Sequence, residues 1–168
     1  MNHAWFSRQG AALAPAEQRA LADLLGAHPA LGDAQLVVVA SWGEAASIVR
    51  AGEWDTAWWD VEEAEREALW QAAADRLGER AVVERVTAEN DALAPAIREA
   101  VRIAATTGGL GTTEVPQLAA GAALLALQQA TLAELAGAGA EHYFVRKLAL
   151  FAMGRWPLGL VRPRYFVF

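Results

Sequence analysis

The sequence predicts a mainly α-helical protein of the α+β class, a compact bundle of five to six helices with a short C-terminal β-hairpin. Apolar residues recur every three or four positions along most of the 168 residues, which is the period of an amphipathic helix. Alanine, the strongest helix former, occurs 40 times. The β-prone runs are short and lie at residues 35–40 and near the C-terminus.

The length and the lack of repeats or linkers predict a single globular domain over residues 1–168, with residues 1–14 loosely ordered. The first helix is expected over residues 15–26. Pro15 suits a first helical turn, and Glu17 places a negative charge near the positive end of the helix dipole. Glycines and a proline between residues 26 and 32 end it.

Residues 35–40 (QLVVVA) permit two interpretations. Three consecutive valines favour a buried strand, which could pair with the C-terminal hairpin. Ser41 and Glu44 then have the spacing of a capping box, so a helix could begin directly afterwards. The alternative is one continuous helix from Asp33 to Ala51. We prefer the strand followed by a helix.

Residues 52–59 are expected to form a connector, and a second capping pattern at Asp60 predicts a helix from there to Leu77. Its buried side is expected to comprise Val61, Ala64, Ala68, Leu69, Ala72 and Leu77. The next helix covers residues 81–105. Because proline lacks an N–H and disrupts a helix interior, Pro95 predicts a break near Asn90 or a new start near Leu93.

Residues 106–113 (TTGGLGTT) are expected to form a helix end and a connector. A phosphate-binding loop would need a preceding strand and a nearby lysine, whereas the single lysine is Lys147. A long helix then runs from Pro116 to Ala136. Its buried face is expected to contain Leu118, Ala122, Leu125, Gln129 and Leu132.

The C-terminal part predicts a helix over residues 141–153 and then a hairpin of strands 158–161 and 165–168. The apolar stripe of that helix is expected to comprise Phe144, Leu148 and either Phe151 or Ala152. Because the last four residues are apolar and aromatic, we expect their backbone to be paired rather than free in solvent.

The residue types exclude several chemistries. The chain has no cysteine, so it cannot form a disulfide or a thiolate site. None of the three histidines lies three residues after a glutamate, and none of the three serines lies in a G-x-S-x-G motif. We therefore expect no metal and no cofactor, and the sequence leans away from an enzyme.

Tryptophans and charges are unevenly distributed. Four of the seven tryptophans lie within residues 54–70. Residues 53–91 carry a net charge of −8, and residues 142–168 carry +5. These two blocks could lie against each other, or the basic block could form a small anion-binding surface. The overall charge of −6 argues against nucleic-acid binding, which depends on a coherent positive surface.

The preferred functional hypothesis is a non-catalytic accessory, adaptor or neutralising factor that binds another protein through an acidic, tryptophan-rich surface. The alternative is a small-molecule-binding protein or enzyme with an interhelical pocket lined by tryptophan, carboxylates, His142 and Arg155. The candidate binding residues are Trp54, Trp58, Trp59, Asp60, Glu63, Glu67, His142, Arg155 and Trp156.

The expected partner is a protein, with self-association as a homodimer through residues 116–136 as a further option. Thirteen arginines against one lysine, with abundant alanine, indicate a bacterium with a GC-rich genome. The first residues lack the apolar core of a secretory signal, and the apolar runs are shorter than a membrane span. We therefore expect a cytoplasmic protein with no membrane association.

Overall fold

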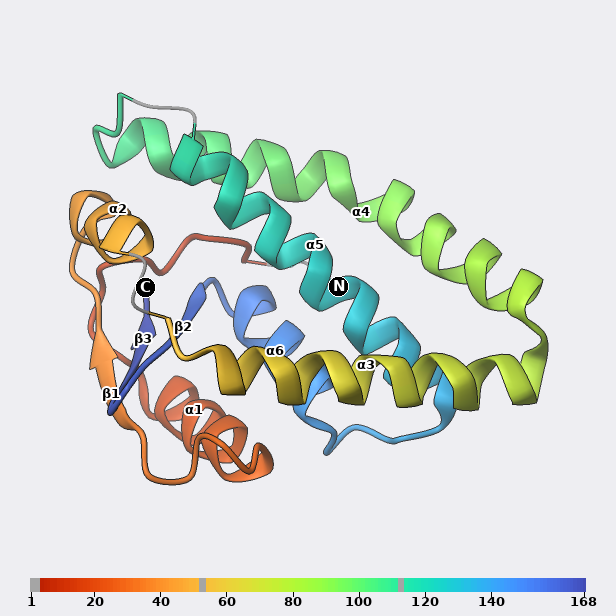
Figure 1. The fold of residues 1–168 in the computed structure, drawn as a ribbon. Helices are drawn as coiled ribbons and strands as arrows, with labels where there is room; N and C mark the ends of the chain where they lie inside the picture. The colour runs from red at the N-terminus through yellow and green to blue at the C-terminus, as the bar shows by residue number, and fades with distance from the viewer. Residues whose placement is uncertain (1–3, 52–53, 112–113) are drawn as a thin grey trace.

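The structure is a computed structural model that describes residues 4–51, 54–111 and 114–168 (Figure 1). Helices dominate this part of the chain, and a small sheet lies at one end of them. The elements in chain order are α1 (Pro15–Ala27), β1 (Gln35–Val38), α2 (Trp42–Ala51), α3 (Thr56–Leu77), α4 (Glu79–Thr107), α5 (Glu114–Ala136), α6 (Tyr143–Ala152), β2 (Pro157–Val161) and β3 (Arg164–Val167). The predicted fold class is confirmed.

The sheet has the strand order β1-β3-β2. Strand β3 pairs with β2 in antiparallel fashion as the predicted hairpin, and with β1 in parallel fashion. The strand interpretation of residues 35–40 is therefore correct, and the continuous helix is excluded. Pairing continues to the end of the chain, because Phe168 and Trp156 exchange backbone hydrogen bonds of 2.6 and 2.9 Å. The C-terminal backbone is paired, as expected.

Helix α5 packs against α3, α4 and α6, and in Figure 1 it crosses the molecule between them. Its buried face is mostly alanine, including Ala119, Ala123, Ala126, Ala130 and Ala133. The predicted leucine face is wrong in part, since Leu118 and Leu125 are 47% and 46% exposed. Small side chains let neighbouring helices approach closely, which favours the alanine face for the interior.

Helix α3 begins one turn earlier than predicted. Asp55, not Asp60, caps it by accepting a 2.9 Å hydrogen bond from the Ala57 N–H. The predicted buried side is correct at Leu69 and wrong at its other positions, since Val61 and Leu77, for example, are exposed. The residues that face inward are Trp58, Glu62, Leu69 and Ala73. Glu62 occupies a core position because it has a buried cationic partner, described below.

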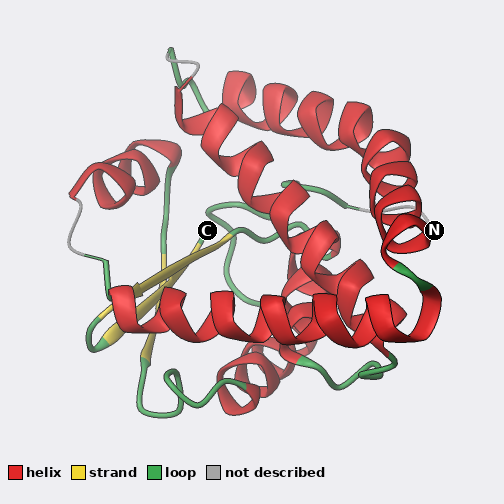
Figure 2. Ribbon diagram, turned by 45° about the vertical axis from the view of Figure 1, so that its right-hand side comes forward, coloured by secondary structure: helices red, strands yellow, loops and turns green. Residues whose placement is uncertain are grey.

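Helix α4 continues through Pro95, so the predicted break near Asn90 or Leu93 is wrong. The helix axis changes direction along its length (Figure 2), as expected where a proline removes one backbone hydrogen bond. Beyond the proline, Ile97, Val101 and Ala105 are buried. This apolar face packs in the core beside α5.

The N-terminal segment packs against the fold from residue 4 onward. The Ala4 N–H donates to the Ala152 carbonyl, and the Trp5 and Phe6 side chains are buried. Loose order was expected for residues 1–14, but the described part of that segment contributes two aromatic residues to the core. Residues 1–3 lie outside the described residues.

Helix α5 is the one described helix that is long and apolar enough to cross a membrane, by length and composition only. Within the structure, 56% of its apolar window is buried, as in the core helix of a soluble protein. Leu118 and Leu125 remain on its outer surface. Self-association of two copies through this helix therefore stays a prediction, which light scattering at two concentrations would test.

Candidate functional site

A cavity of about 620 Å³ lies where α1, α3 and α6 meet, and we call it the acidic cavity. In Figure 1, α1 lies below the first half of α3. The lining comes from the end of α1 and the turn after it, from one face of α3 and from the start of α6. Its polar and aromatic members are Asp23, His28, Glu62, Glu65, Glu141, His142, Tyr143, Phe144 and Arg146.

A buried ion pair forms the floor of the acidic cavity. Lys147 and Glu62 are 7% and 6% exposed, and the Lys147 ammonium donates to both Glu62 carboxylate oxygens at 2.8 Å. The same ammonium donates to Gln129 Oε1 at 3.3 Å. Burial lowers the pKa of Lys147, and the hydrogen-bonded Glu62 carboxylate acts in the opposite direction. The pair thus fixes one carboxylate at the base of the cavity.

Two aromatic side chains extend this network. Tyr143 donates its hydroxyl to Glu62 Oε1 at 2.7 Å and accepts from the Trp58 indole N–H at 3.3 Å. Burial raises the pKa of the Tyr143 hydroxyl well above its ordinary value, so the phenol stays protonated and acts as a donor to Glu62. The Trp58 ring lies so close to Gly159 that a Cβ there would be 2.7 Å from it.

His28 contributes a neutral ring to the cavity wall. Burial lowers the pKa of this histidine, while the nearby Glu62 carboxylate opposes that effect. Its Nδ1 accepts the Ala30 N–H at 3.1 Å, which places the ring proton on Nε2. Within the described part of the chain, this buried Nε2 has no hydrogen-bond partner. An acceptor brought by a bound molecule would satisfy it.

His142 lies at the start of α6, where its Nδ1 caps the helix by accepting the Phe144 N–H at 3.2 Å. The proton on Nε2 therefore points to Glu65 Oε1, 3.0 Å away. The alternative hypothesis from the sequence grouped His142 with carboxylates such as Asp60 and Glu63, whereas the carboxylate that His142 meets in the structure is that of Glu65.

The cavity carries a surplus of negative charge. Its lining holds four carboxylates and one guanidinium, that of Arg146. Arg146 contacts Asp23 at 3.7 Å and also pairs with Glu141. Lys147 neutralises Glu62 from below. Two negative charges are left over, so the cavity favours a positively charged occupant.

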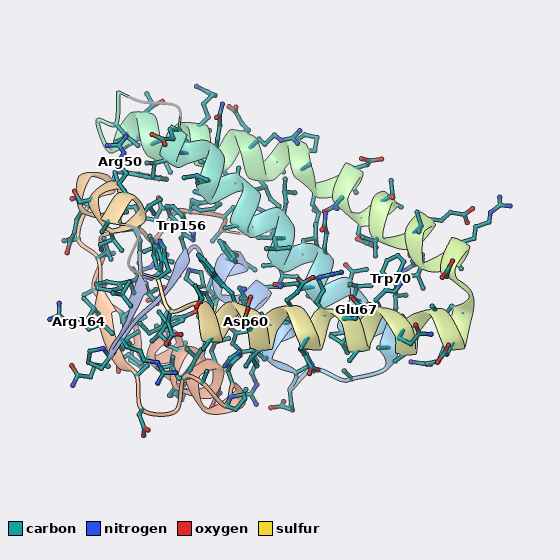
Figure 3. The ribbon with its side chains drawn as sticks, in the orientation of Figure 1. Arg50, Asp60, Glu67, Trp70, Trp156 and Arg164 are labelled. Carbon is teal, nitrogen blue, oxygen red and sulfur yellow. The ribbon has the colours of Figure 1, made fainter. Side chains whose placement is uncertain are left out.

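Most residues predicted from the sequence lie elsewhere. Asp60, Glu63 and Glu67 are exposed on α3, and Figure 3 shows Asp60 and Glu67 along this helix. Glu63 pairs with Arg66 on the same helix at 2.5 Å. Trp59 is 46% exposed, and its ring centroid lies 6.4 Å from that of the partly buried Trp54.

Trp58, Trp156 and Arg155 are buried, so none of them forms an exposed binding surface. Trp156 packs in the core 6.1 Å from the Trp42 ring, which places it near α2 (Figure 3). Arg155 is fully buried and donates to Glu17 at 2.9 Å, away from the acidic cavity. The interpretation of Arg155 as part of an interhelical pocket is wrong, because it joins α6 to α1 instead.

Sequence reasoning missed the central residues of the site: His28, Glu62, Glu65, Tyr143 and Lys147. A signal for two of them was present. Lys147 lies three residues after Phe144 and four before Phe151, inside the apolar stripe of α6. Glu62 likewise lies on the buried face of α3, together with Trp58, Leu69 and Ala73. Opposite charges at core positions of two helices indicate a buried pair, because either charge alone would be too costly to bury.

The acidic and basic blocks of the sequence do meet. Lys147 pairs with Glu62, Arg162 with Asp55, and His142 with Glu65. Three contacts therefore join residues 53–91 to residues 142–168. The two blocks therefore lie against each other and neutralise each other in part, through the Lys147–Glu62 and Arg162–Asp55 ion pairs, whereas Arg155 pairs with Glu17 outside the acidic block.

Comparison with known proteins gives no assignment: no family model, no curated protein and no solved structure matches this chain. Across residues 4–51, 54–111 and 114–168, no three His, Asp or Glu side chains come close enough together to hold a metal ion.

Proposed function

We propose that this protein binds a small organic cation, an amine carried on an apolar or aromatic body, in the acidic cavity. The observation that carries the proposal is the surplus of carboxylates around a cavity of about 620 Å³ that is floored by the buried Glu62–Lys147 pair. Cavities of this size that combine apolar walls, a few polar groups and shifted pKa values are characteristic of ligand sites.

The positions of the polar groups support a defined orientation for such a ligand. Glu65 is half exposed at the cavity edge and is positioned by the His142 imidazole. The ring centroids of Tyr143 and His28 lie 4.6 Å apart in the wall of the acidic cavity. An ammonium group would meet the Glu65 carboxylate, and the apolar body would lie along these rings, of which the Tyr143 ring also attracts cations.

Three probes of similar shape and different charge test this function. Benzylammonium is the cation, benzyl alcohol is the neutral analogue and benzoate is the anion. We expect benzylammonium to bind most tightly, and its affinity to fall as salt is raised because part of the attraction is electrostatic. Nuclear magnetic resonance titration should show shifts at His142 and Tyr143. Equal binding of benzoate would contradict the proposal.

Two substitutions on α3 provide a matched pair. Glu65→Gln removes a cavity carboxylate while keeping its shape, and we expect it to weaken benzylammonium binding about fivefold. Glu67→Gln also removes one negative charge from α3, but Glu67 lies two residues after Glu65 and outside the cavity lining. It should leave the affinity within about a factor of two of the native value. An equal loss of benzylammonium affinity in both variants would show that only the net charge of the protein matters and not the position of Glu65.

A second candidate function is protein binding through the acidic tryptophan-rich surface of α3. One observation favours it: Trp59 is 46% exposed beside the exposed Asp60 and Glu63. A basic partner would meet this surface, with Trp59 as the apolar anchor. In this view the protein is a cytoplasmic bacterial adaptor or neutralising factor.

Co-purification at low and high salt tests this second function. A basic protein should be retained by the native chain at low salt and lost by Trp59→Ala. Leu125→Ala, which removes an equally exposed apolar side chain from α5, is the control and should retain the partner. Identical recovery with both variants would exclude Trp59 as the anchor.

A further inference from the structure

A second cavity, of about 550 Å³, lies at the other end of the molecule, and we call it the aromatic cavity. Its walls come from residues 5–9, from the connection between β1 and α2, from the last turns of α4 and from the C-terminal residue. The lining residues are Trp5, Phe6, Ser7, Gln9, Ala40, Ser41, Trp42, Ala100, Ile103, Ala104, Thr107, Gly108 and Phe168.

The side chains of this lining are uncharged, and four of them are aromatic: Trp5, Phe6, Trp42 and Phe168. Trp42 and Phe168 meet edge to face, with ring centroids 5.1 Å apart. The Trp42 indole is fixed by a 3.1 Å hydrogen bond from Nε1 to the Ala104 carbonyl. Because aromatic walls present flat surfaces, and because no side chain of the lining carries a charge, the cavity fits a flat and neutral molecule.

Gln9 is the polar group of this wall that the fold leaves unsatisfied. Both its amide nitrogen and its amide oxygen are shielded from solvent, and neither has a hydrogen-bond partner within the described residues. A buried amide without partners is destabilising, because it has lost its hydrogen bonds to water. A molecule in the cavity reaches the amide only when the side chain turns out of this shielded position, which its three rotatable bonds allow.

The segment that carries Gln9 is held in a strained conformation. Phe6 has φ 55°, in the left-handed region that non-glycine residues rarely adopt. The Ser7 N–H donates to the Ala4 carbonyl at 2.8 Å, and the Arg8 N–H donates to the Gly154 carbonyl at 3.2 Å. The Phe6 ring packs against Phe151. Backbone strain held by surrounding contacts is frequent at ligand-binding sites.

We propose that the aromatic cavity binds a flat, uncharged heterocycle with a lactam edge, in which an N–H and a C=O lie side by side. The Gln9 amide offers the complementary pair, an Oε1 acceptor and an Nε2 donor. The two groups form two parallel hydrogen bonds while the aromatic residues cover the ring faces. This site is independent of the acidic cavity and of the function proposed for it.

One pair of compounds tests the proposal on the native chain. Isoquinolin-1(2H)-one has the lactam edge, and isocoumarin has nearly the same shape with a ring oxygen in place of the N–H donor. A site that hydrogen-bonds a ligand N–H discriminates strongly against an analogue lacking it. We expect isoquinolin-1(2H)-one to bind at least about tenfold more tightly than isocoumarin. Its binding should shift the nuclear magnetic resonance signal of the Trp42 indole N–H. Equal binding of the two compounds would overturn the proposal.

Substitution of Gln9 gives a second and independent readout. Gln9→Leu should abolish the discrimination between the two compounds and raise the melting temperature, because it removes a buried unpaired amide. Gln117→Leu, an exposed glutamine on α5, is the matched control and should keep the discrimination. Retention of the tenfold preference in Gln9→Leu would contradict the assignment of Gln9.

The two cavities can be tested separately in one sample. Benzylammonium at saturation should not displace isoquinolin-1(2H)-one, because the two sites lie among different elements. Competition between them would place both compounds in one cavity and overturn the second site. Failure of benzylammonium alone would contradict only the function proposed for the acidic cavity.

Discussion

The acidic cavity and the aromatic cavity use opposite ways of presenting polar groups. In the acidic cavity, Glu62, Lys147 and Tyr143 bond to one another, so the fold satisfies them and leaves an excess of charge at the surface of the cavity. In the aromatic cavity, the Gln9 amide has no hydrogen-bond partner among the described residues, and no charged side chain lines the cavity. The first arrangement selects a ligand by charge, and the second selects it by hydrogen-bond pattern.

Both regions depend on a tryptophan packed against a glycine. A Cβ on Gly159 would lie 2.7 Å from the Trp58 ring, and a Cβ on Gly108 would lie 2.2 Å from Trp42 Cδ1. The glycine-rich sequence at residues 106–113 is therefore explained in part by packing: Gly108 caps α4 and leaves room for the indole. Residues 112 and 113 lie outside the described residues.

The largest expected effect comes from breaking the floor of the acidic cavity. Lys147→Met leaves the Glu62 carboxylate buried without its cation and should lower the free energy of unfolding by about 3–5 kcal/mol. Chemical denaturation followed by tryptophan fluorescence measures this. The double variant Glu62→Gln with Lys147→Met removes both charges and should recover much of the loss. A double variant as unstable as the single one would show that the pair itself is not the cause.

The next effect concerns Glu17, which joins α1 beside the acidic cavity to the N-terminal segment of the aromatic cavity. Burial alone would raise the pKa of this carboxyl, but hydrogen bonds from Arg155, the Ala14 N–H and Arg8 outweigh burial and lower the pKa from 4.5 to about 2. Because the folded-state pKa lies below the unfolded value, the stabilisation is complete above pH 4.5 and is lost as the pH falls towards 2.

The size of this acid-dependent loss is roughly 3 kcal/mol. Urea denaturation between pH 6 and pH 2 should show it in the native chain. Glu17→Gln should be less stable at neutral pH, since the buried Arg155 then lacks its anion, and its stability should vary less with pH. A pH dependence as steep as that of the native chain would assign the acid sensitivity to other carboxyl groups.

A smaller effect is expected from a change confined to the aromatic cavity. Gly108→Ala forces its new methyl group against Trp42 and should lower the free energy of unfolding by about 1–3 kcal/mol. It should also weaken isoquinolin-1(2H)-one binding and leave benzylammonium binding unchanged. Loss of both ligands together would indicate that the two regions are coupled through the core.

The smallest effect serves as a control for that substitution. Gly121 lies on the exposed side of α5, and nothing is within 4 Å of a Cβ placed there. Gly121→Ala should therefore raise the free energy of unfolding by about 0.5–1 kcal/mol, through helix propensity alone. Thermal unfolding measures the change. A destabilised Gly121→Ala would show that close packing extends over this face as well.

Prediction from the sequence succeeded for features that depend on neighbouring residues. It failed for features that depend on contacts with residues far away in the chain. The strand at residues 35–38 and the C-terminal hairpin were predicted correctly, because β-branched residues and turn positions act over a few residues. The start of α3 was placed at Asp60 although Asp55 caps it. Both residues are suitable caps, and the choice depends on how Trp58 packs against the sheet.

The candidate site shows the same difference between local sequence signals and contacts between distant residues. His142 was placed in the interhelical cavity, as the structure also has it, whereas Arg155 and Trp156 lie elsewhere. Periodicity alone ranks charged residues as exposed, so Glu62 was left out of the predicted buried side of α3. A buried charge becomes favourable only when another segment supplies its counter-charge, and the sequence separation between Glu62 and Lys147 conceals that partner.

The sequence by itself determined the helical class, the strand and hairpin segments, the lack of cysteine chemistry and the two opposed charge blocks. The tertiary structure alone decided which face of α5 is buried, that α4 continues through Pro95, and where the cavities form. The physical reason is that helix and strand preferences act between neighbouring residues, whereas burial, ion pairing and cavity shape depend on residues brought together from distant parts of the chain.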